Sequence, residues 1–331
     1  MGTYLVRRLL LLIPTLLLVT IIVFLLVRFI PGSAVDLMVA EMSDLASHYG
    51  GEDTVEAVRE SLGLDVAIPT QYGRWLGVVP QENGAFSGVF QGDLGNSLWT
   101  ARPVLDSILA RFPITLEIGL IALIAGLLIA LPIGVFSAIR QDTTTDYMGR
   151  TVAIIFISVP SFWLGTMLII YPAVWWNWAP STQYVSFLKD PIENLRMFIP
   201  AGILLGMILS GTTMRMARSM MLEVMRQDYI RTAWAKGLKE RVVVMRHALK
   251  NALIPVVTTV GVLIPVLIGG SVVIEKIFTL PGVGLFLVEA LNYRDYPIIS
   301  GINLFTATVI VIVNLAIDMT YAWLDPRVKY K

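Results

Sequence analysis

The most informative stretch of this sequence is DYIRTAWAKGLKERVVVMRHALKNALIPVVT, residues 228–258. It is basic and rich in helix-forming residues, and a long apolar run lies on either side of it. Residues 228–236 predict a short helix, which Gly237 ends because glycine adopts the left-handed conformation without steric cost. A second helix is expected from Lys239 into the following apolar run. The segment therefore predicts a membrane chain that presents a rigid helical surface on one side of the bilayer.

The composition is that of a polytopic membrane protein. Of the 331 residues, 56% are hydrophobic and only 15% are charged, and the mean hydropathy is +0.74. These values exceed those of soluble globular chains. A helix needs about 20 apolar residues to cross the bilayer, and backbone polar groups in lipid must pair within the segment. We therefore predict an all-α fold with six transmembrane helices, at residues 9–27, 114–139, 151–174, 198–214, 252–274 and 298–324.

Lysine and arginine collect on one side of the predicted membrane. Nine basic residues lie within 215–250, whereas residues 31–112 contain four arginines against eleven acidic residues. Because basic residues near a span resist translocation, we expect both termini and the basic loop to be cytoplasmic. The expected regions are an N-terminal helix in 1–30, an extracytoplasmic segment in 31–112, and a core membrane domain in 113–331 with a cytoplasmic loop at 215–251 and an outer loop at 275–297.

The outer side is predicted to hold short helices. Residues 54–62 and 70–78 have helical spacing, and the stretch between Val79 and Gly92 has the Pro, Asn-Gly and Gly content of a loop. The apolar run at 285–291 is too short to cross the bilayer. It therefore predicts an interfacial or re-entrant helix.

Several function classes are disfavoured. No cysteine occurs, and the two histidines, His48 and His247, fall on opposite sides of the predicted membrane, so a metal site is not expected. We find no paired acids, histidine cluster or activated nucleophile of the kind an enzyme needs. The orientation rule already explains the basic loop, so nucleic acid is not an expected partner. An ion-coupled carrier or channel remains as an alternative class.

The fifth predicted span is interrupted by residues that weaken helices. These are Pro255, Gly261, Pro265, Gly269 and Gly270. Broken helices are tolerated where they face protein or water, so these residues are candidates for lining a pathway. Glycines also allow close helix packing, and both interpretations stay open. Ionisable residues within spans are candidates for function, but for Glu117 and Asp318 we expect a structural role.

The basic segment resembles the cytoplasmic loop of ATP-binding-cassette importer permeases of the dipeptide, oligopeptide, glutathione and nickel branch. The similarity is seen in YIRTAWAKGLKERVVVMRHALKNALIPVV, and other family motifs occur in the same order along almost the whole chain. Further matching motifs are RRLLLLIPTLLLVTIIVFLLVRFIPG near the start, ESLGLD from Glu60, GDLGNS from Gly92, TLEIG from Thr115, IEKIFTLPGVG from Ile274, NYRDYPII from Asn292 and DPRVKYK at the end.

The resemblance implies a type I importer permease in the bacterial inner membrane. Such a chain pairs with a second, homologous permease in a heterodimer, beneath an extracytoplasmic substrate-binding protein and above two cytoplasmic ATPases. No G-x-x-x-x-G-K-[ST] motif occurs in this sequence, so ATP and Mg²⁺ are expected to bind the ATPases and not this chain. We expect no cofactor of its own. The cargo is expected to be di- or oligopeptides, with glutathione, nickel chelates or another small solute as alternatives.

The resemblance also implies that residues 228–237 are a coupling helix that docks on an ATPase. The expected contact and hinge residues are Asp228, Arg231, Thr232, Ala233, Lys236 and Gly237. Two departures from the family pattern occur. Arg231, Thr232 and Ala233 replace the Glu-Ala-Ala triplet of the general importer consensus, so contacts of that glutamate are not transferred. The stretch GAFSGVF lengthens the outer segment before GDLG.

Overall fold

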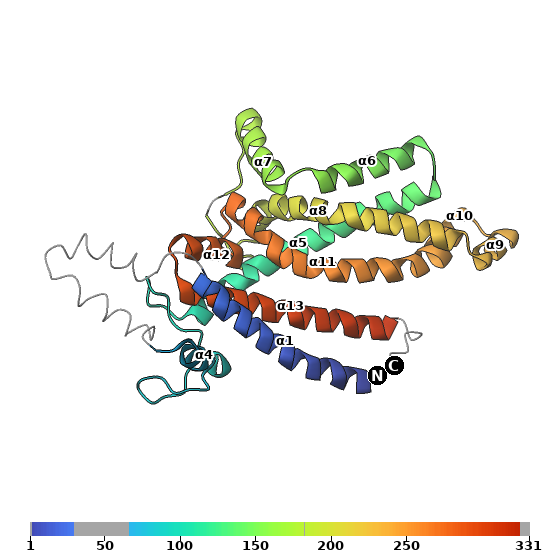
Figure 1. The fold of residues 1–331 in the computed structure, drawn as a ribbon. Helices are drawn as coiled ribbons and strands as arrows, with labels where there is room; N and C mark the ends of the chain where they lie inside the picture. Colours follow the sequence, from blue (N-terminus) through green and yellow to red (C-terminus); the bar gives the residue numbers. More distant parts are fainter. Residues whose placement is uncertain (1, 30–65, 182, 325–331) are drawn as a thin grey trace. The chain divides into compact units, whose positions relative to one another are not determined.

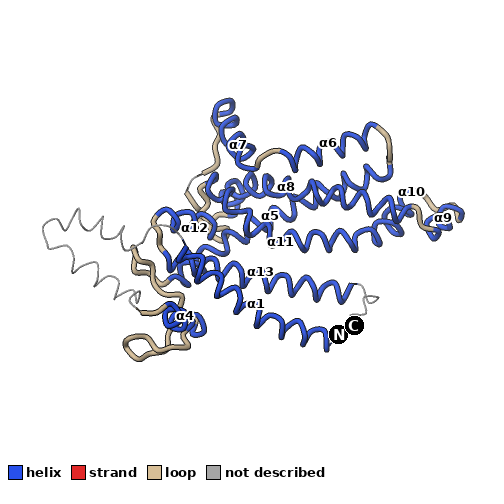
Figure 2. The backbone as a smooth tube through the Cα atoms, viewed as in Figure 1, coloured by secondary structure: helices blue, strands red, loops and turns tan. Residues whose placement is uncertain are grey.

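The computed structural model describes residues 2–29, 66–181 and 183–324. Within these ranges the chain is helical apart from loops and one isolated bridge between Asn96 and Pro103, as Figure 2 shows. The helix predicted at 54–62 lies outside the described residues. The all-α expectation agrees with the described parts of the chain.

Five of the six predicted spans lie within continuous helices (Figure 1). Each helix extends beyond its predicted span at one end or both, because polar and amphipathic turns continue the helix past the apolar core of the sequence. These helices are α1 (Gly2–Phe29), α5 (Val104–Ile139), α8 (Pro191–Met225), α11 (Leu249–Phe278) and α13 (Tyr296–Leu324).

The span predicted at 151–174 is broken in the structure. The chain forms α6 (Thr144–Ser158) and α7 (Ser161–Trp176), and their axes differ by 97°. Val159 leaves the helical region with φ −81° and ψ 128°, because the ring of Pro160 disfavours the helical conformation in the preceding residue. The prediction of one continuous span across this apolar run was therefore wrong.

The described chain divides into two compact units. The larger contains Phe112–Leu285, and the smaller is formed from parts of 7–111 together with Phe286–Val309. In the larger unit, α5, α8 and α11 enclose an apolar core that includes Ile118, Phe198 and Ile274, each fully buried. The predicted fourth span, short and rich in glycine, belongs to the 35-residue helix α8.

A close approach of α8 to α5 explains the glycines of that span. A Cβ added at Gly206 would lie 2.6 Å from the carbonyl oxygen of Ala122 and 2.9 Å from the nitrogen of Gly126. Small residues allow two membrane helices to pack with their backbones close together. Glycine at this position therefore serves packing between α5 and α8.

The smaller unit contains the described part of the segment that was predicted to be extracytoplasmic. The helix expected at 70–78 is α4 (Ile68–Leu76), which ends at Gly77 with φ 81°. After the short turn η1 (Val89–Gln91), the hydroxyl of Ser97 donates to Asp295 Oδ2 at 2.6 Å. The expected short helix at 285–291 is present as α12 (Val283–Asn292).

Candidate functional site

The short helix predicted at the start of the basic loop is present as α9 (Asp228–Ala235). It follows α8 after Gln227, and its last turn leads into Gly237, whose φ is +74°. The prediction of a glycine stop is therefore confirmed. Figure 1 shows α9 at the end of α8, next to the three-residue helix α10 (Glu240–Val242).

One face of α9 is buried in the larger unit. Ile230 is fully buried and Ala233 is only 6% exposed, because residues three apart lie on the same side of a helix. They join an apolar cluster with Met221, Val243 and Val244. The side chain of Ala233, one of the expected contact residues, is therefore covered by the chain itself.

The opposite face of α9 is exposed and polar. Asp228, Arg231, Thr232 and Lys236 are all exposed. Arg231 Nη1 lies 3.3 Å from Asp228 Oδ1, but both side chains are largely in solvent, and such pairs add little stability. Trp234, which was not among the predicted contact residues, is 42% exposed on the same helix. A large aromatic residue in a short polar helix was the available signal for it.

The connection from α9 to α11 differs from the single helix predicted after Lys239. After α10 the chain adopts π-helical geometry in η2 (Val243–Ala248) and then enters α11. The π-helix places Val243, Val244 and Ala248 in the cluster beneath α9. The side-chain amide of Asn251 also donates to Tyr229 Oη at 2.8 Å. Helix α9 is thus attached to α11 by apolar contacts and a hydrogen bond.

The candidate pathway residues lie in a helix that is not broken. Helix α11 continues through both Pro255 and Pro265, and Gly261 is buried within it. Gly269 is exposed, and a Cβ added there would meet no neighbouring atom within 4 Å, while Gly270 is helical. The assignment of these five residues to a pathway stays a prediction. The described breaks lie after Ser158 and after Phe278.

Two buried acids in the larger unit were not predicted from the sequence. Asp146 in α6 is fully buried and accepts two hydrogen bonds from Arg218, both at 2.7 Å. Arg150 Nη2 donates to Asp146 Oδ2 at 2.6 Å, and the Ser137 hydroxyl also donates to the carboxylate. We call these four residues the Asp146 cluster. The spacing of Asp146 and Arg150 in TTTDYMGR was the signal that could have identified part of it.

The second buried acid is Glu275, near the end of α11. It is fully buried, and its carboxylate accepts hydrogen bonds from the Thr115 hydroxyl at 2.8 Å and from the Leu285 nitrogen at 2.9 Å. The fifth span was predicted to end at Ile274, immediately before this residue. Of the two ionisable residues that were expected within spans, Glu117 is partly buried, and the side chain of Asp318 lies outside the described residues.

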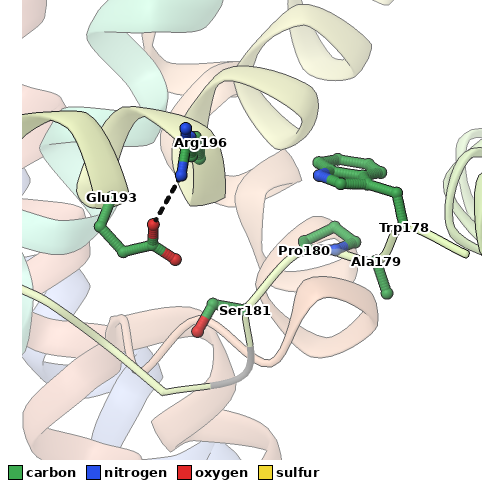
Figure 3. A pocket seen from close by; sticks show the side chains of 6 residues that line it. All are labelled: Trp178, Ala179, Pro180, Ser181, Glu193 and Arg196. Carbon is green, nitrogen blue, oxygen red and sulfur yellow. Dashed lines mark hydrogen bonds and ion pairs between the residues drawn. The ribbon is translucent and has the colours of Figure 1, made fainter.

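A cavity of about 330 Å³ lies beside the first turns of α8, at the end of that helix away from α9. Figure 3 shows its lining: Trp178, Ala179, Pro180, Ser181, Glu193 and Arg196. Glu193 and Arg196 form an ion pair at 3.4 Å, so their charges offset each other at this surface. The lining residues include none of the predicted site residues.

Comparisons with known proteins cover nearly the whole chain. The family model described as binding-protein-dependent transport system inner membrane component matches residues 130–330, and the model of the N-terminal part of such components matches residues 1–119. A putative peptide transport system permease protein of Brucella abortus is 39% identical over 330 residues, covering 100% of both chains. The oligopeptide transport system permease protein AppB of Bacillus subtilis is 39% identical over 338 residues, again covering 100% of both chains.

A solved structure shares the fold. A chain of the MetNI methionine ABC transporter, in an inward-facing conformation, superposes with a TM-score of 0.54 at 17% sequence identity. The match covers 66% of this chain and 96% of that chain. The likeness extends the comparison from sequence to the arrangement of helices.

Proposed function

This chain belongs to the family of binding-protein-dependent transport system inner membrane components, and from that premise we propose that it forms half of a peptide translocation pathway driven by separate ATPases. It is the permease of an ABC importer in the bacterial inner membrane. In the proposed complex, a second permease completes the pathway, two ATPases lie on the cytoplasmic side, and a binding protein delivers cargo from outside.

The observation that supports the coupling role is the two-sided character of α9. Ile230 and Ala233 anchor the helix on the apolar cluster, while Arg231 and Thr232 point into solvent. A rigidly attached helix with an exposed polar face is suited to docking in a groove of another protein. We assign that groove to an ATPase, with Asp228, Arg231, Thr232 and Lys236 as contacts and Gly237 as the turn that ends the helix.

Nucleotide chemistry in this proposal belongs to the ATPases. The chain has no phosphate-binding loop motif, and we assign to it no cofactor, metal or catalytic residue. Its own contribution is mechanical. Displacement of α9 acts on α11 through the apolar cluster and through the Tyr229–Asn251 hydrogen bond.

We propose that transport proceeds by alternating access, in which the complex switches between outward-facing and inward-facing states. The attachment of α9 to α11 has to transmit the energy for this switch. Reversing a two-state population from 1:99 to 99:1 requires about 5.5 kcal/mol of differential binding. Closure of the ATPases on ATP, together with docking of the loaded binding protein, supplies this difference in our scheme. Hydrolysis then returns the complex to the inward-open state.

The docking role is testable by site-directed cross-linking, because the chain contains no cysteine. We would label Thr232→Cys with a photoactivatable thiol reagent in the assembled importer, with Lys189→Cys as the control just before α8. Both positions are exposed, so labelling is matched. The proposal expects Thr232→Cys to cross-link to an ATPase and Lys189→Cys not to do so. Absence of an ATPase adduct at Thr232 in the intact complex would overturn the docking assignment.

The coupling role is testable with a matched pair of glycine variants. Gly237 and Gly84 both have positive φ and free space at the Cβ position, so valine introduces the same backbone strain at each. We expect Gly237→Val to reduce ATP-dependent uptake about tenfold through the cost of the left-handed conformation, and Gly84→Val to leave it unchanged. Equal uptake by both variants, with normal ATPase association, contradicts the coupling role.

The peptide assignment rests on the relatives, which are named as peptide and oligopeptide permeases. Proteoliposomes containing the complete importer should take up a labelled di- or oligopeptide in preference to glutathione or a nickel chelate. Uptake driven by an ion gradient without ATP would instead indicate a carrier or channel. A preference for glutathione or a nickel chelate would leave the proposed ATP-driven mechanism in place and would change only the assigned cargo.

A further inference from the structure

The first turn of α12 is capped by side chains from other helices. An isolated helix start leaves its first backbone N–H groups without partners. Here the Val283 nitrogen donates to Thr115 Oγ1 at 2.9 Å, and the Leu285 nitrogen donates to Glu275 Oε2 at 2.9 Å. Thr115 belongs to α5 and Glu275 to α11. Two separate helices therefore supply the polar partners of a third.

Glycines make this arrangement sterically possible. A Cβ added at Gly282 would lie 2.5 Å from the carboxyl carbon of Glu275, and one added at Gly284 would lie 2.7 Å from the Cα of Val272. A serine or aspartate at Gly282, the usual kind of local helix cap, would meet the carboxylate that occupies this space. The residues of the motif IEKIFTLPGVG thus fit together around Glu275.

The carboxylate is held by neutral donors. Thr115 Oγ1 donates to Glu275 Oε1 at 2.8 Å and also accepts from Val283, so one hydroxyl links the acid to the helix start. Burying an ionisable group is costly even when it is hydrogen-bonded. An aliphatic residue would pack here without that cost but would leave the first turn of α12 without its acceptor. We call Glu275, Thr115, Val283 and Leu285 the Glu275 cluster.

The Glu275 cluster and α9 lie near opposite ends of α11. This helix has 30 residues, which corresponds to a length of about 45 Å at 1.5 Å per residue. Its first turn contains Asn251, which bonds to Tyr229 of α9, and its last turn contains Glu275. A displacement of α9 that moves α11 therefore reaches the start of α12 through the turn after Phe278, through the close packing of Gly284 on Val272, and through this cluster.

We propose that Glu275 is a positioning residue for transport, which holds the first turn of α12 to α11 and α5 so that the three move together at the end of the bundle opposite α9. The inference rests on the proposed coupling role of α9. It adds that cargo passage requires the far end of α11 to move the start of α12, and that the buried carboxylate provides the connection.

The experiment is Glu275→Gln in the complete importer, reconstituted with its ATPases and binding protein. The amide keeps the size of the side chain, but its NH₂ group cannot accept, so either Thr115 or Leu285 loses its acceptor. We expect binding-protein-stimulated ATP hydrolysis to stay within about twofold, while peptide transported per ATP hydrolysed falls about tenfold, as for loss of one hydrogen bond to a charged group. Glu193→Gln at the exposed ion pair is the matched control and should leave the ratio unchanged.

A second pair of variants covers the case in which Glu275→Gln does not assemble. Thr115→Val removes the bridging hydroxyl at nearly constant volume, and Thr115→Ser retains it. Reduced transport per ATP in the valine variant, with a normal ratio in the serine variant, supports the inference. A normal ratio in either Glu275→Gln or Thr115→Val overturns it.

The outcome is separable from a failure of the proposed function. If Thr232→Cys still cross-links to an ATPase and Gly237→Val still lowers uptake while Glu275→Gln is normal, only the positioning role of Glu275 is wrong. If the α9 variants show no ATPase contact and no loss of uptake, the coupling assignment itself is wrong.

Discussion

The two buried acids of the larger unit are stabilised in opposite ways. Asp146 and Glu275 are each 0% exposed, but Asp146 is bonded to two arginines, whereas the donors to Glu275 are hydroxyls and backbone nitrogens. The first arrangement joins α6 to α8 through full charges. The second joins α11, α5 and the start of α12 through neutral donors.

The difference decides what remains when each acid is removed. Without Asp146, the mostly buried side chain of Arg218, 18% exposed, loses the carboxylate that compensates its charge. Without Glu275, neutral donors lose an acceptor, which is a smaller penalty. We therefore expect the Asp146 cluster to be the stronger determinant of stability, and the Glu275 cluster to act mainly on the coordination of helix movements.

The largest effect should follow from Asp146→Ala. Breaking a buried ion pair by removing one partner costs about 3–5 kcal/mol, because the other charge stays buried. The free energy of unfolding, measured on the purified chain in detergent, should fall by that amount. Asp142→Asn is the control, since Asp142 also contacts Arg150 but its side chain is 63% exposed. A loss below about 1 kcal/mol for Asp146→Ala would remove the contrast between the clusters.

A smaller loss of stability is expected for Glu275→Gln. A buried donor left without an acceptor costs about 1–3 kcal/mol. The same unfolding measurement should therefore rank this variant below Asp146→Ala and above Glu193→Gln. If Glu275→Gln proves as destabilising as Asp146→Ala, the neutral surroundings of Glu275 do not lessen the penalty and the comparison fails.

The helices could be predicted from the sequence because lipid imposes a simple requirement on them. Long apolar runs have to satisfy their own backbone hydrogen bonds, so five of the six predicted segments lie within continuous helices and the sixth is divided between α6 and α7. The break in the third span depends on a single residue, Pro160, inside a run that is otherwise apolar. The loop helix α9 and its glycine stop were also predictable, because both depend on residues adjacent in the chain.

The buried clusters could not be predicted because their partners are distant in sequence. Asp146 and Arg218 are 72 positions apart, and Thr115 and Glu275 are 160 apart. The burial of Glu275 was also not evident from the sequence, because Glu275 and Lys276 are consecutive charged residues, and such a pair indicates the end of a span. In the structure the helix continues to Phe278 and buries the acid. The burial of Ala233 depends likewise on distant residues, because the position of the apolar cluster determines which face of α9 is covered.

An exposed hydrogen bond between neutral groups should matter less than either buried cluster. Tyr229→Phe removes the hydroxyl that accepts a hydrogen bond from the side-chain amide of Asn251. Both residues are exposed. Water can replace the lost partner, so we expect a change of about 0.5–1 kcal/mol in the free energy of unfolding. The same variant reports on coupling, since it removes the one hydrogen bond described between α9 and α11. We expect a modest decrease in transport per ATP, because the apolar contacts of Ile230 remain.

The smallest change in the free energy of unfolding is expected for an aspartate–arginine ion pair that is exposed to water and not buried as in the Asp146 cluster. Asp228→Asn breaks the ion pair with Arg231, in which the two side chains are 96% and 74% exposed. Exposed pairs contribute about 0.2–1 kcal/mol and weaken as salt is added, so the stability change should be small and should shrink further at high ionic strength. Unfolding of Asp228→Asn and Asp146→Ala measured at low and high salt tests this directly. A salt-sensitive Asp146 cluster, or a strongly destabilised Asp228 variant, would show that burial does not separate the two aspartate–arginine contacts.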